Sequence, residues 1–200
     1  MPRPRRRNGC ATGPTGKYAG AYVAIAHPAW YSITERDIET VGLVDAIEVV
    51  NGVAFDHNDH ADSWQIADIM LGRGLRYNVC ATDDFHGTAN RHDFRRGWVW
   101  VKSESLEPAA LLAALKAGHY YSSTGPEIYD IQLVPGDKLL VHCSPANRVF
   151  FTGCGSRSVA APGNGSTYFE LNLSKFDSPY GRLTVRGVDG GRAWSNPIWF

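Results

Sequence analysis

The pattern of apolar residues changes near residue 125, and this change constrains the fold more than any other feature of the sequence. Before it, apolar segments alternate with segments of helical spacing, which favours a parallel sheet or part of a (β/α) barrel. After it, short alternating segments are separated by Gly, Pro, Asn and Ser, as in a small β-sandwich. We predict a basic, disordered tail (residues 1–19), a partial α/β barrel (residues 20–124) and a β-sandwich domain (residues 125–200).

Four strands and three helices are predicted in the α/β part. The first helix has the clearest signal, because Thr34 and Asp37 form a variant of the capping box and Gly42 ends the pattern. Residues 53–62 are predicted to form a loop. The strands are expected at residues 21–26, 44–50, 75–81 and 97–101, and the helices at residues 34–42, 63–71 and 106–117.

Seven short strands are predicted in the second part, spaced as in a small sandwich. This part shows no metal-ligand or nucleophile pattern, so its predicted role is structural or substrate-gating. The expected strands are residues 127–134, 138–143, 147–152, 156–160, 166–173, 180–188 and 192–199.

Composition indicates a soluble, globular chain, with 44% hydrophobic and 20% charged residues in a total of 200. The apolar run near the N-terminus, residues 22–26, is too short for a membrane span or a signal peptide, so we expect a cytoplasmic protein. The four cysteines form no CxxC pair and are expected to be reduced.

The formal net charge of zero divides into two unequal parts. The first nine residues contain four arginines and no acid, so the rest of the chain carries 16 basic and 20 acidic residues. An arginine cluster can bind phosphate polyanions, but we interpret this one as a solvated tail. An acidic body without a basic and aromatic stripe makes nucleic acid an unexpected partner.

Polar side chains follow three of the predicted strands. His27 follows the first, Glu48 and Asn51 close the second, and Asp83, Asp84 and His86 follow the third. Carboxyl ends of parallel strands meet at one edge of a sheet, so we expect these side chains to converge. Imidazole and carboxylate together suit Zn²⁺, Mn²⁺ or Fe²⁺, and Asp84 and His86 would face the same side of an extended segment.

Each of these residues also has an ordinary structural interpretation. A histidine before proline is usually a turn residue, and an Asp-Asp pair after a strand usually caps a helix or turn. A second group of histidines and aspartates is predicted to be a loop near the site rather than a set of direct ligands: Asp56, His57, Asp59, His60 and Asp62. The sequence contains no G-x-S-x-G, GxxxxGK[ST] or HExxH motif, and Cys80, inside a predicted strand, is expected to be a buried thiol.

Several motifs together resemble one family of enzymes. AHPAWYSIT, IEVVNG, ATDDFHG, GWVWV, LKAGHYYSSTGPEI and AWSNPIWF occur at residues 26–34, 47–52, 81–87, 97–101, 115–128 and 193–200. Their order resembles the C-terminal part of PHP-domain metal-dependent phosphoesterases and hydrolases, in the branch whose barrel is followed by a small β domain. The resemblance covers about residues 20–200.

The resemblance implies a distorted (β/α)7 barrel with two or three divalent metal ions that activate water against a phosphoester or a related ester. It implies that His27, Asp84 and His86 are metal ligands and that Asp84 and Glu48 are catalytic. Asn51 and Asp83 would contact the substrate or support the ligands. The implied partner is a small phosphoester or ester substrate.

One departure from the family is large. PHP proteins begin with an H-x-H strand that supplies two ligands, and this sequence contains no H-x-H. A complete barrel needs roughly 200 residues or more, whereas the predicted α/β part has 105. The sequence therefore also fits a non-catalytic, truncated remnant that acts as a structural or interaction module. An incomplete barrel edge could then promote self-association. A nuclease is the third and weakest interpretation.

Overall fold

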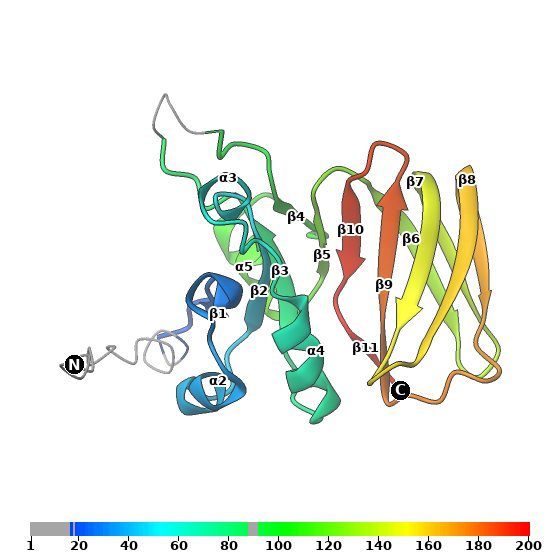
Figure 1. Ribbon diagram of the computed structural model, residues 1–200, viewed down its shortest axis with the longest axis horizontal. Helices are drawn as coiled ribbons and strands as arrows, with labels where there is room; N and C mark the ends of the chain where they lie inside the picture. Colours follow the sequence, from blue (N-terminus) through cyan, green and yellow to red (C-terminus); the bar gives the residue numbers. More distant parts are fainter. Residues whose placement is uncertain (1–16, 18, 88–91) are drawn as a thin grey trace.

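The computed structural model describes residues 17, 19–87 and 92–200, so the predicted basic tail lies almost entirely outside the described residues. Two sheets form the framework (Figure 1). The smaller is parallel, in the order β1-β2-β3, and the larger has eight antiparallel strands. The parallel strands are β1 (Ala24–Ile25), β2 (Ala46–Asn51) and β3 (Asn78–Thr82).

All three predicted helices are present at nearly the expected positions. They are α2 (Glu35–Val41), α4 (Trp64–Gly72) and α5 (Pro108–Lys116). Thr34 caps α2 in a full capping box with Asp37, as predicted, because each side chain accepts a hydrogen bond from the other residue's backbone. The predicted loop 53–62 contains one helical turn, α3 (Ala54–His57), and η1 (Pro28–Tyr31) is a 3-10 turn directly after β1.

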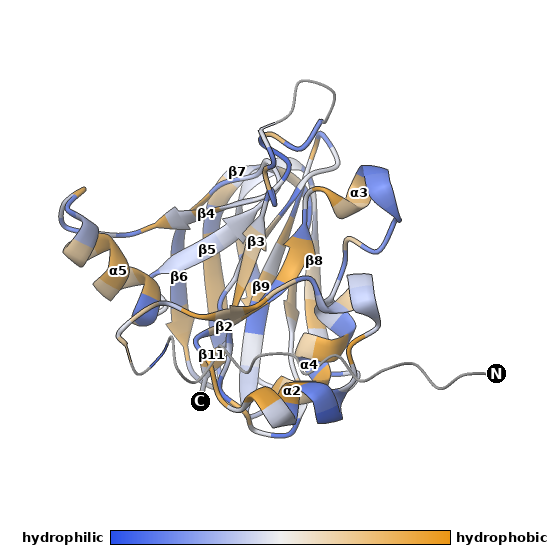
Figure 2. Cartoon of the chain, turned by 90° about the vertical axis from the view of Figure 1, so that its left-hand side faces the viewer, coloured by the Kyte–Doolittle hydropathy of each residue, from blue (hydrophilic) through white to orange (hydrophobic). Residues whose placement is uncertain are grey.

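The parallel sheet has an apolar cluster on one face. Ile47 and Val49 of β2 and Val79 of β3 are almost fully buried against Met70 of α4. Figure 2 shows α4 largely in apolar colours and α3 with a polar end. Trp194 from the C-terminal part belongs to the same cluster. The core of the parallel sheet therefore depends on residues more than 100 positions away in the sequence.

The predicted partial (β/α)7 barrel is wrong. β4 (Trp98–Val101), predicted as the next parallel strand, pairs antiparallel with β5 (Tyr120–Ser123), which pairs with β10 (Arg192–Ser195). The described residues contain only four α-helices, and none of them connects β3 to β4. A parallel crossover usually needs such a helix. The eight-stranded sheet thus crosses the boundary predicted near residue 125.

Side chains, rather than a fourth strand, occupy the outer edge of β3. The Val79 N–H donates to Asn196 Oδ1 at 2.9 Å, and the Ser122 hydroxyl donates to the Val79 carbonyl at 3.3 Å. The Asn196 amide nitrogen donates in turn to the carbonyls of Gly118 and Tyr120. These bonds satisfy backbone groups that a barrel strand would otherwise pair.

The prediction of seven short strands in a sandwich is also wrong. The segments 138–143 and 147–152 form one strand, β7 (Lys138–Thr152), and the next two predicted strands form β8 (Ser158–Asn172). The pairing of β7 shifts register between His142 and Arg148, a stretch that includes Pro145. Proline has no N–H for the ladder, so the strand bends there without ending. The remaining strands are β6 (Ile128–Val134), β9 (Tyr180–Gly187) and β11 (Ile198–Trp199).

The larger sheet wraps around a second apolar cluster. It includes Phe151 and Val149 of β7, Leu183 and Val185 of β9, and Leu139, all with no exposed surface. Gly181 has no room for a side chain, because a Cβ there would lie 2.1 Å from the Phe151 ring. No helix among the described residues is long and apolar enough to cross a membrane.

One ion pair joins α4 to the larger sheet. The Arg182 guanidinium donates to both carboxylate oxygens of Asp68, at 2.8 and 2.7 Å, and lies 3.9 Å from the centre of the Trp64 ring. The side chain of Arg182 is only 10% exposed. A bidentate pair with little exposure is stronger than an ordinary surface pair.

We expect Arg182→Met to lower the free energy of unfolding by about 2 kcal/mol, because it keeps the aliphatic contact but leaves Asp68 without its partner. The control is Lys138→Met, which removes the exposed Lys138–Glu170 pair and is expected to cost less than about 0.5 kcal/mol. Urea unfolding of both variants measures the difference. Equal losses would contradict the role assigned to Arg182.

Candidate functional site

The carboxyl ends of the three parallel strands bring together four of the residues singled out from the sequence. His27 follows β1, Glu48 and Asn51 lie on β2, and Asp84 follows β3. Hydrogen bonds connect these residues, as described below, into one group that we call the strand-end cluster: His27, Glu48, Asn51 and Asp84. The predicted convergence is confirmed for these four.

Glu48 is the centre of the strand-end cluster. It alternates along β2 with Ile47 and Val49 of the apolar cluster, so its side chain lies on the opposite face of the sheet, and the residue is only 4% exposed. The carboxylate accepts hydrogen bonds from the His27 N–H, from the Thr82 hydroxyl and from the Asn51 amide, the last at 3.3 Å to each oxygen. A buried carboxylate is costly unless it is satisfied in this way. Glu48 therefore joins the ends of all three strands.

Asn51 joins the two carboxylates of the cluster. Its amide nitrogen lies 3.3 Å from Asp84 Oδ2 as well as from both oxygens of Glu48, and its oxygen accepts from the Ala54 N–H at 3.1 Å. The next residue, Gly52, allows this close approach, because a Cβ there would lie 2.8 Å from the Asp83 carbonyl oxygen. Neither Glu48 nor Asp84 forms an ion pair with a lysine or arginine within the described ranges.

Two residues of the cluster have left-handed backbone conformations. His27 has φ 33° and Asp84 has φ 53°, in a region that residues other than glycine rarely adopt. Strained backbone of this kind tends to gather at functional sites. His27 Nδ1 is also buried and has no hydrogen-bond partner among the described residues. Its ring lies 5.8 Å from Trp30 and 5.4 Å from Tyr31, centre to centre.

Asp83 lies outside the strand-end cluster. Its carboxylate accepts from the backbone N–H groups of Arg95, Arg96 and Gly97, at 2.7 Å for Arg95 and 2.8 Å for Gly97. These bonds fix the segment that leads into β4. The substrate contact predicted for Asp83 stays a prediction, and the role that its hydrogen bonds show is structural.

His86 is also separate from the cluster, because the left-handed turn at Asp84 interrupts the extended segment predicted for Asp84 and His86. Its backbone N–H donates to Asp93 Oδ2 at 3.0 Å, and its ring Nδ1 lies 3.5 Å from the same oxygen. Asp93 is 2% exposed, and its Oδ1 has no partner among the described residues. Sequence reasoning missed Asp93, which no recognisable spacing connects to His86.

The second group of histidines and aspartates has mostly structural contacts. Asp56 pairs with Arg96 at 3.1 Å, Asp62 accepts from the Trp64 N–H at 2.9 Å, and the His57 ring stacks on Trp30 at 4.9 Å. These contacts place the segment beside the strand-end cluster, as predicted. His57 and Trp30 form part of its surroundings.

The strand-end cluster fits a divalent cation in its chemistry but not in its number of ligands. It offers carboxylate oxygens without a cationic partner and an imidazole nitrogen that is buried and unpaired in the described chain. Zn²⁺ and Mn²⁺ accept these donors. No group of three or more His, Cys, Asp or Glu side chains in the described residues is close enough to hold a metal. Any ion bound here would need further ligands.

Cys80 is buried beside the cluster, as predicted. Burial, and to a smaller extent the charge of Glu48, raises the pKa of the Cys80 thiol to about 12. Burial and Cys80 likewise raise the pKa of Tyr22, whose hydroxyl lies 2.7 Å from the Tyr120 hydroxyl. A thiol with a raised pKa is a poor nucleophile at neutral pH. Cys80 and Tyr22 therefore stay protonated at neutral pH.

No family model, curated protein or solved structure matches the chain. The resemblance to PHP-domain enzymes therefore stays a prediction, and the function is inferred from the residues of the site.

We expect Cys80 to lower the free energy of unfolding as the pH rises above 9. The unfolded thiol ionises near its ordinary value of 9.0, whereas the folded thiol stays protonated up to about 12. The contribution of Cys80 is complete below pH 9 and is lost as the pH rises towards 12. In this range, the titration of one thiol lowers the free energy of unfolding by at most about 1.4 kcal/mol per pH unit. Urea unfolding of the wild type and Cys80→Ala between these values should show a shallower decline in the variant; identical declines would contradict this.

We also expect Asp93 to select the tautomer of His86, keeping the ring proton on Nδ1 and leaving Nε2 free as an acceptor. In Asp93→Asn this preference should be lost, because the amide no longer attracts the Nδ1 proton. Nitrogen-15 NMR of the ring measures the tautomer, and the signals of His142, in the larger sheet, serve as the internal control. An unchanged His86 spectrum would exclude this role.

Proposed function

We propose that the strand-end cluster binds a divalent metal ion and that the chain acts in the metal-dependent hydrolysis of a phosphoester or related ester, in the cytoplasm. The observation that carries the proposal is the shared amide of Asn51. It holds the carboxylates of Glu48 and Asp84 together without a lysine or arginine in the described chain to balance them. Adjacent carboxylates of this kind attract a cation.

His27 and Asp84 are the proposed ligands within the strand-end cluster, and His86, which contacts Asp93 outside the cluster, would have to move towards it to be the third. His27 Nδ1 is buried and unpaired in the described chain, and the only hydrogen bond of Asp84 there involves Oδ2, which leaves Oδ1 available. His86 would offer Nε2 if Asp93 keeps the proton on Nδ1. When bound, the metal would lower the pKa of a water molecule and polarise the substrate.

The chain's own residues would arrange the reaction. Glu48 fixes the His27 backbone and the Thr82 hydroxyl, so it holds the ligand-bearing segments in register. Asn51 orients Asp84. Asp84 Oδ1 would bind the metal beside the attacking water, and the aromatic rings of Trp30 and Tyr31 would limit the access of other water beside His27.

A second candidate function is a non-catalytic interaction module. The observation that favours it is the lack of a three-ligand group in the part of the chain that the structure describes. Such a module would bind one metal loosely or not at all. Self-association through an edge of the parallel sheet belongs to this alternative.

One experiment separates the two candidates. After treatment with a chelator, the full chain is titrated with Mn²⁺ and Zn²⁺ by calorimetry, and hydrolysis of an aryl phosphate and an aryl acetate is measured. The hydrolase proposal expects saturable binding and metal-dependent turnover. His27→Ala and Asp84→Asn should each weaken binding by about tenfold or more.

Asp177→Asn, an exposed aspartate in the larger sheet's loops, is the matched control and should bind as the wild type does. Metal binding without turnover would favour the interaction module. The absence of binding, or equal binding by Asp84→Asn, would overturn the metal site itself.

A further inference from the structure

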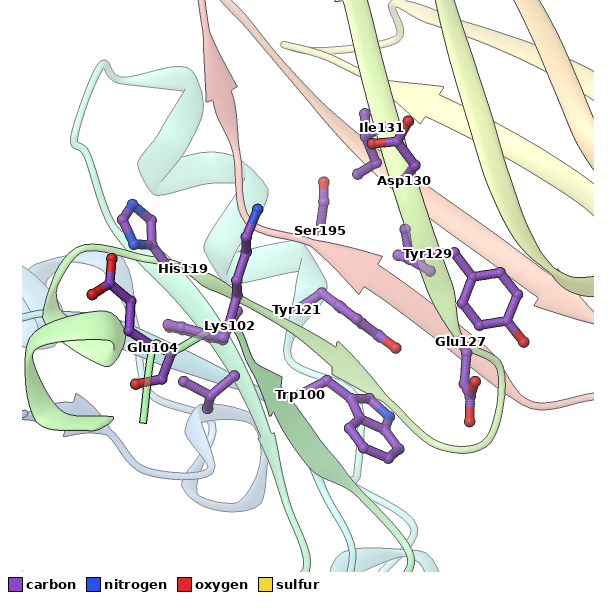
Figure 3. Close-up of a pocket in the computed structure, with 14 residues that line it drawn as sticks. Trp100, Lys102, Glu104, His119, Tyr121, Glu127, Tyr129, Asp130, Ile131 and Ser195 are labelled. Atoms are coloured by element: carbon purple, nitrogen blue, oxygen red, sulfur yellow. The ribbon is translucent and has the colours of Figure 1, made fainter. Parts of the chain in front are cut away.

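A groove separate from the strand-end cluster lies between β4 and β5 on one side and β6 on the other. Its volume is about 900 Å³, which is within the range of small-molecule sites. None of its lining residues belongs to the strand-end cluster. Figure 3 shows side chains from these strands directed into it.

Aromatic rings form one end of the groove. Trp100, Tyr121 and Ser195 are register partners across β4, β5 and β10, so their side chains lie in one row on the same face. Tyr129 of β6 also lines the groove, but its ring lies on the other side of β6 from Trp100 and Tyr121 (Figure 3). Trp100 is 46% exposed, so its ring is available to a ligand.

The β6 wall of the groove is held in place before any ligand arrives. On the other side of β6, the Tyr129 ring meets the His142 ring edge-on at 4.9 Å, and His142 stacks on Tyr168 at 4.1 Å. Glu127 is fixed through its backbone N–H, which donates to Ser144 Oγ at 3.0 Å. A pre-ordered wall loses little conformational entropy on binding.

The charges of the groove are mainly negative. Its lining includes three carboxylates, those of Glu104, Glu127 and Asp130, against one lysine, Lys102. No ion pair neutralises Glu127 or Asp130 in the described ranges. Glu127 lies at the aromatic end, beside Trp100 and Tyr129, whereas Lys102 lies towards His119 and Ser195 (Figure 3). An anionic phosphoester is therefore disfavoured at the aromatic end.

We propose that this groove binds an organic cation, with an alkylammonium or quaternary ammonium group held against Trp100 and Tyr121 and balanced by Glu127. Aromatic faces attract cations through their quadrupole, and the attraction grows when the cation is desolvated. The nearby Glu127 carboxylate attracts a cation electrostatically but does not attract a neutral ligand in this way. The inference does not depend on hydrolysis or on a metal at the strand-end cluster.

The test compares choline with 3,3-dimethylbutan-1-ol, which has the same shape but no charge, at fixed ionic strength. Binding to the full chain is followed by NMR of the Trp100 indole N–H and by calorimetry. We expect choline to bind about tenfold more tightly than the neutral alcohol. Trp100→Ala and Glu127→Gln should each lose most of this preference.

Matched controls are Phe94→Ala, an aromatic residue that is 68% exposed outside the groove, and Glu170→Gln, which belongs to a surface ion pair. Both should bind choline as the wild type does, and so should Asp84→Asn, which separates this site from the strand-end cluster. Equal affinity for the neutral alcohol, absence of choline binding, or unchanged binding by Trp100→Ala would overturn the proposal. Methyl glucoside is measured in the same way as a neutral sugar. If it bound more tightly than choline, the result would overturn the proposal in favour of a sugar site.

Discussion

The outer edge of β3 is the constraint on which the rest of the structure depends. A strand edge exposes backbone donors and acceptors that must be paired or covered. At Val79 both groups are satisfied by side chains, those of Asn196 and Ser122. Because these side chains come from the larger sheet, β5 and the C-terminal segment approach β3 without continuing its ladder. The parallel sheet therefore stops at three strands, and β4 pairs elsewhere.

The strand-end cluster follows from the same arrangement. Parallel strands place their carboxyl ends together, so His27, Glu48, Asn51 and Asp84 meet although up to 57 positions separate them. Most of the hydrogen-bonding atoms of Glu48 and Asn51 are already bonded to backbone N–H groups and to neighbouring side chains, and these bonds fix the positions of both. Among the described residues, His27 Nδ1 and Asp84 Oδ1 have no hydrogen-bond partner. The cluster thus combines a rigid interior with a small number of free donor atoms.

Sequence reasoning was successful where local signals determine the structure. The capping box of Thr34 and Asp37, the apolar strands β2 and β3, and the polar residues at their ends are all readable from neighbouring residues. It failed where contacts between residues far apart in the sequence determine which strands pair and where a strand ends. The GWVWV segment shows a strand but not its partner, and Pro145 looks like the end of a strand although β7 only bends there.

The site was predictable to a similar extent. The convergence of four residues follows from the parallel order, whereas the position of His86 depends on the left-handed turn at Asp84 and on Asp93, seven positions away. No pattern in the sequence indicates that turn. Asp83 illustrates the same limit, since its backbone partners lie in a segment whose path a sequence does not show.

The Arg182–Asp68 pair has a consequence for how the chain unfolds. It ties α4, which covers the parallel sheet, to the centre of the larger sheet, and Trp194 of β10 packs beside Trp64 of α4 in the apolar cluster of the parallel sheet. Neither sheet can open without exposing apolar surface of its neighbour. The two sheets therefore form a single cooperative unit, in which amide protons of β3 and β9 exchange through the same opening rather than through separate ones.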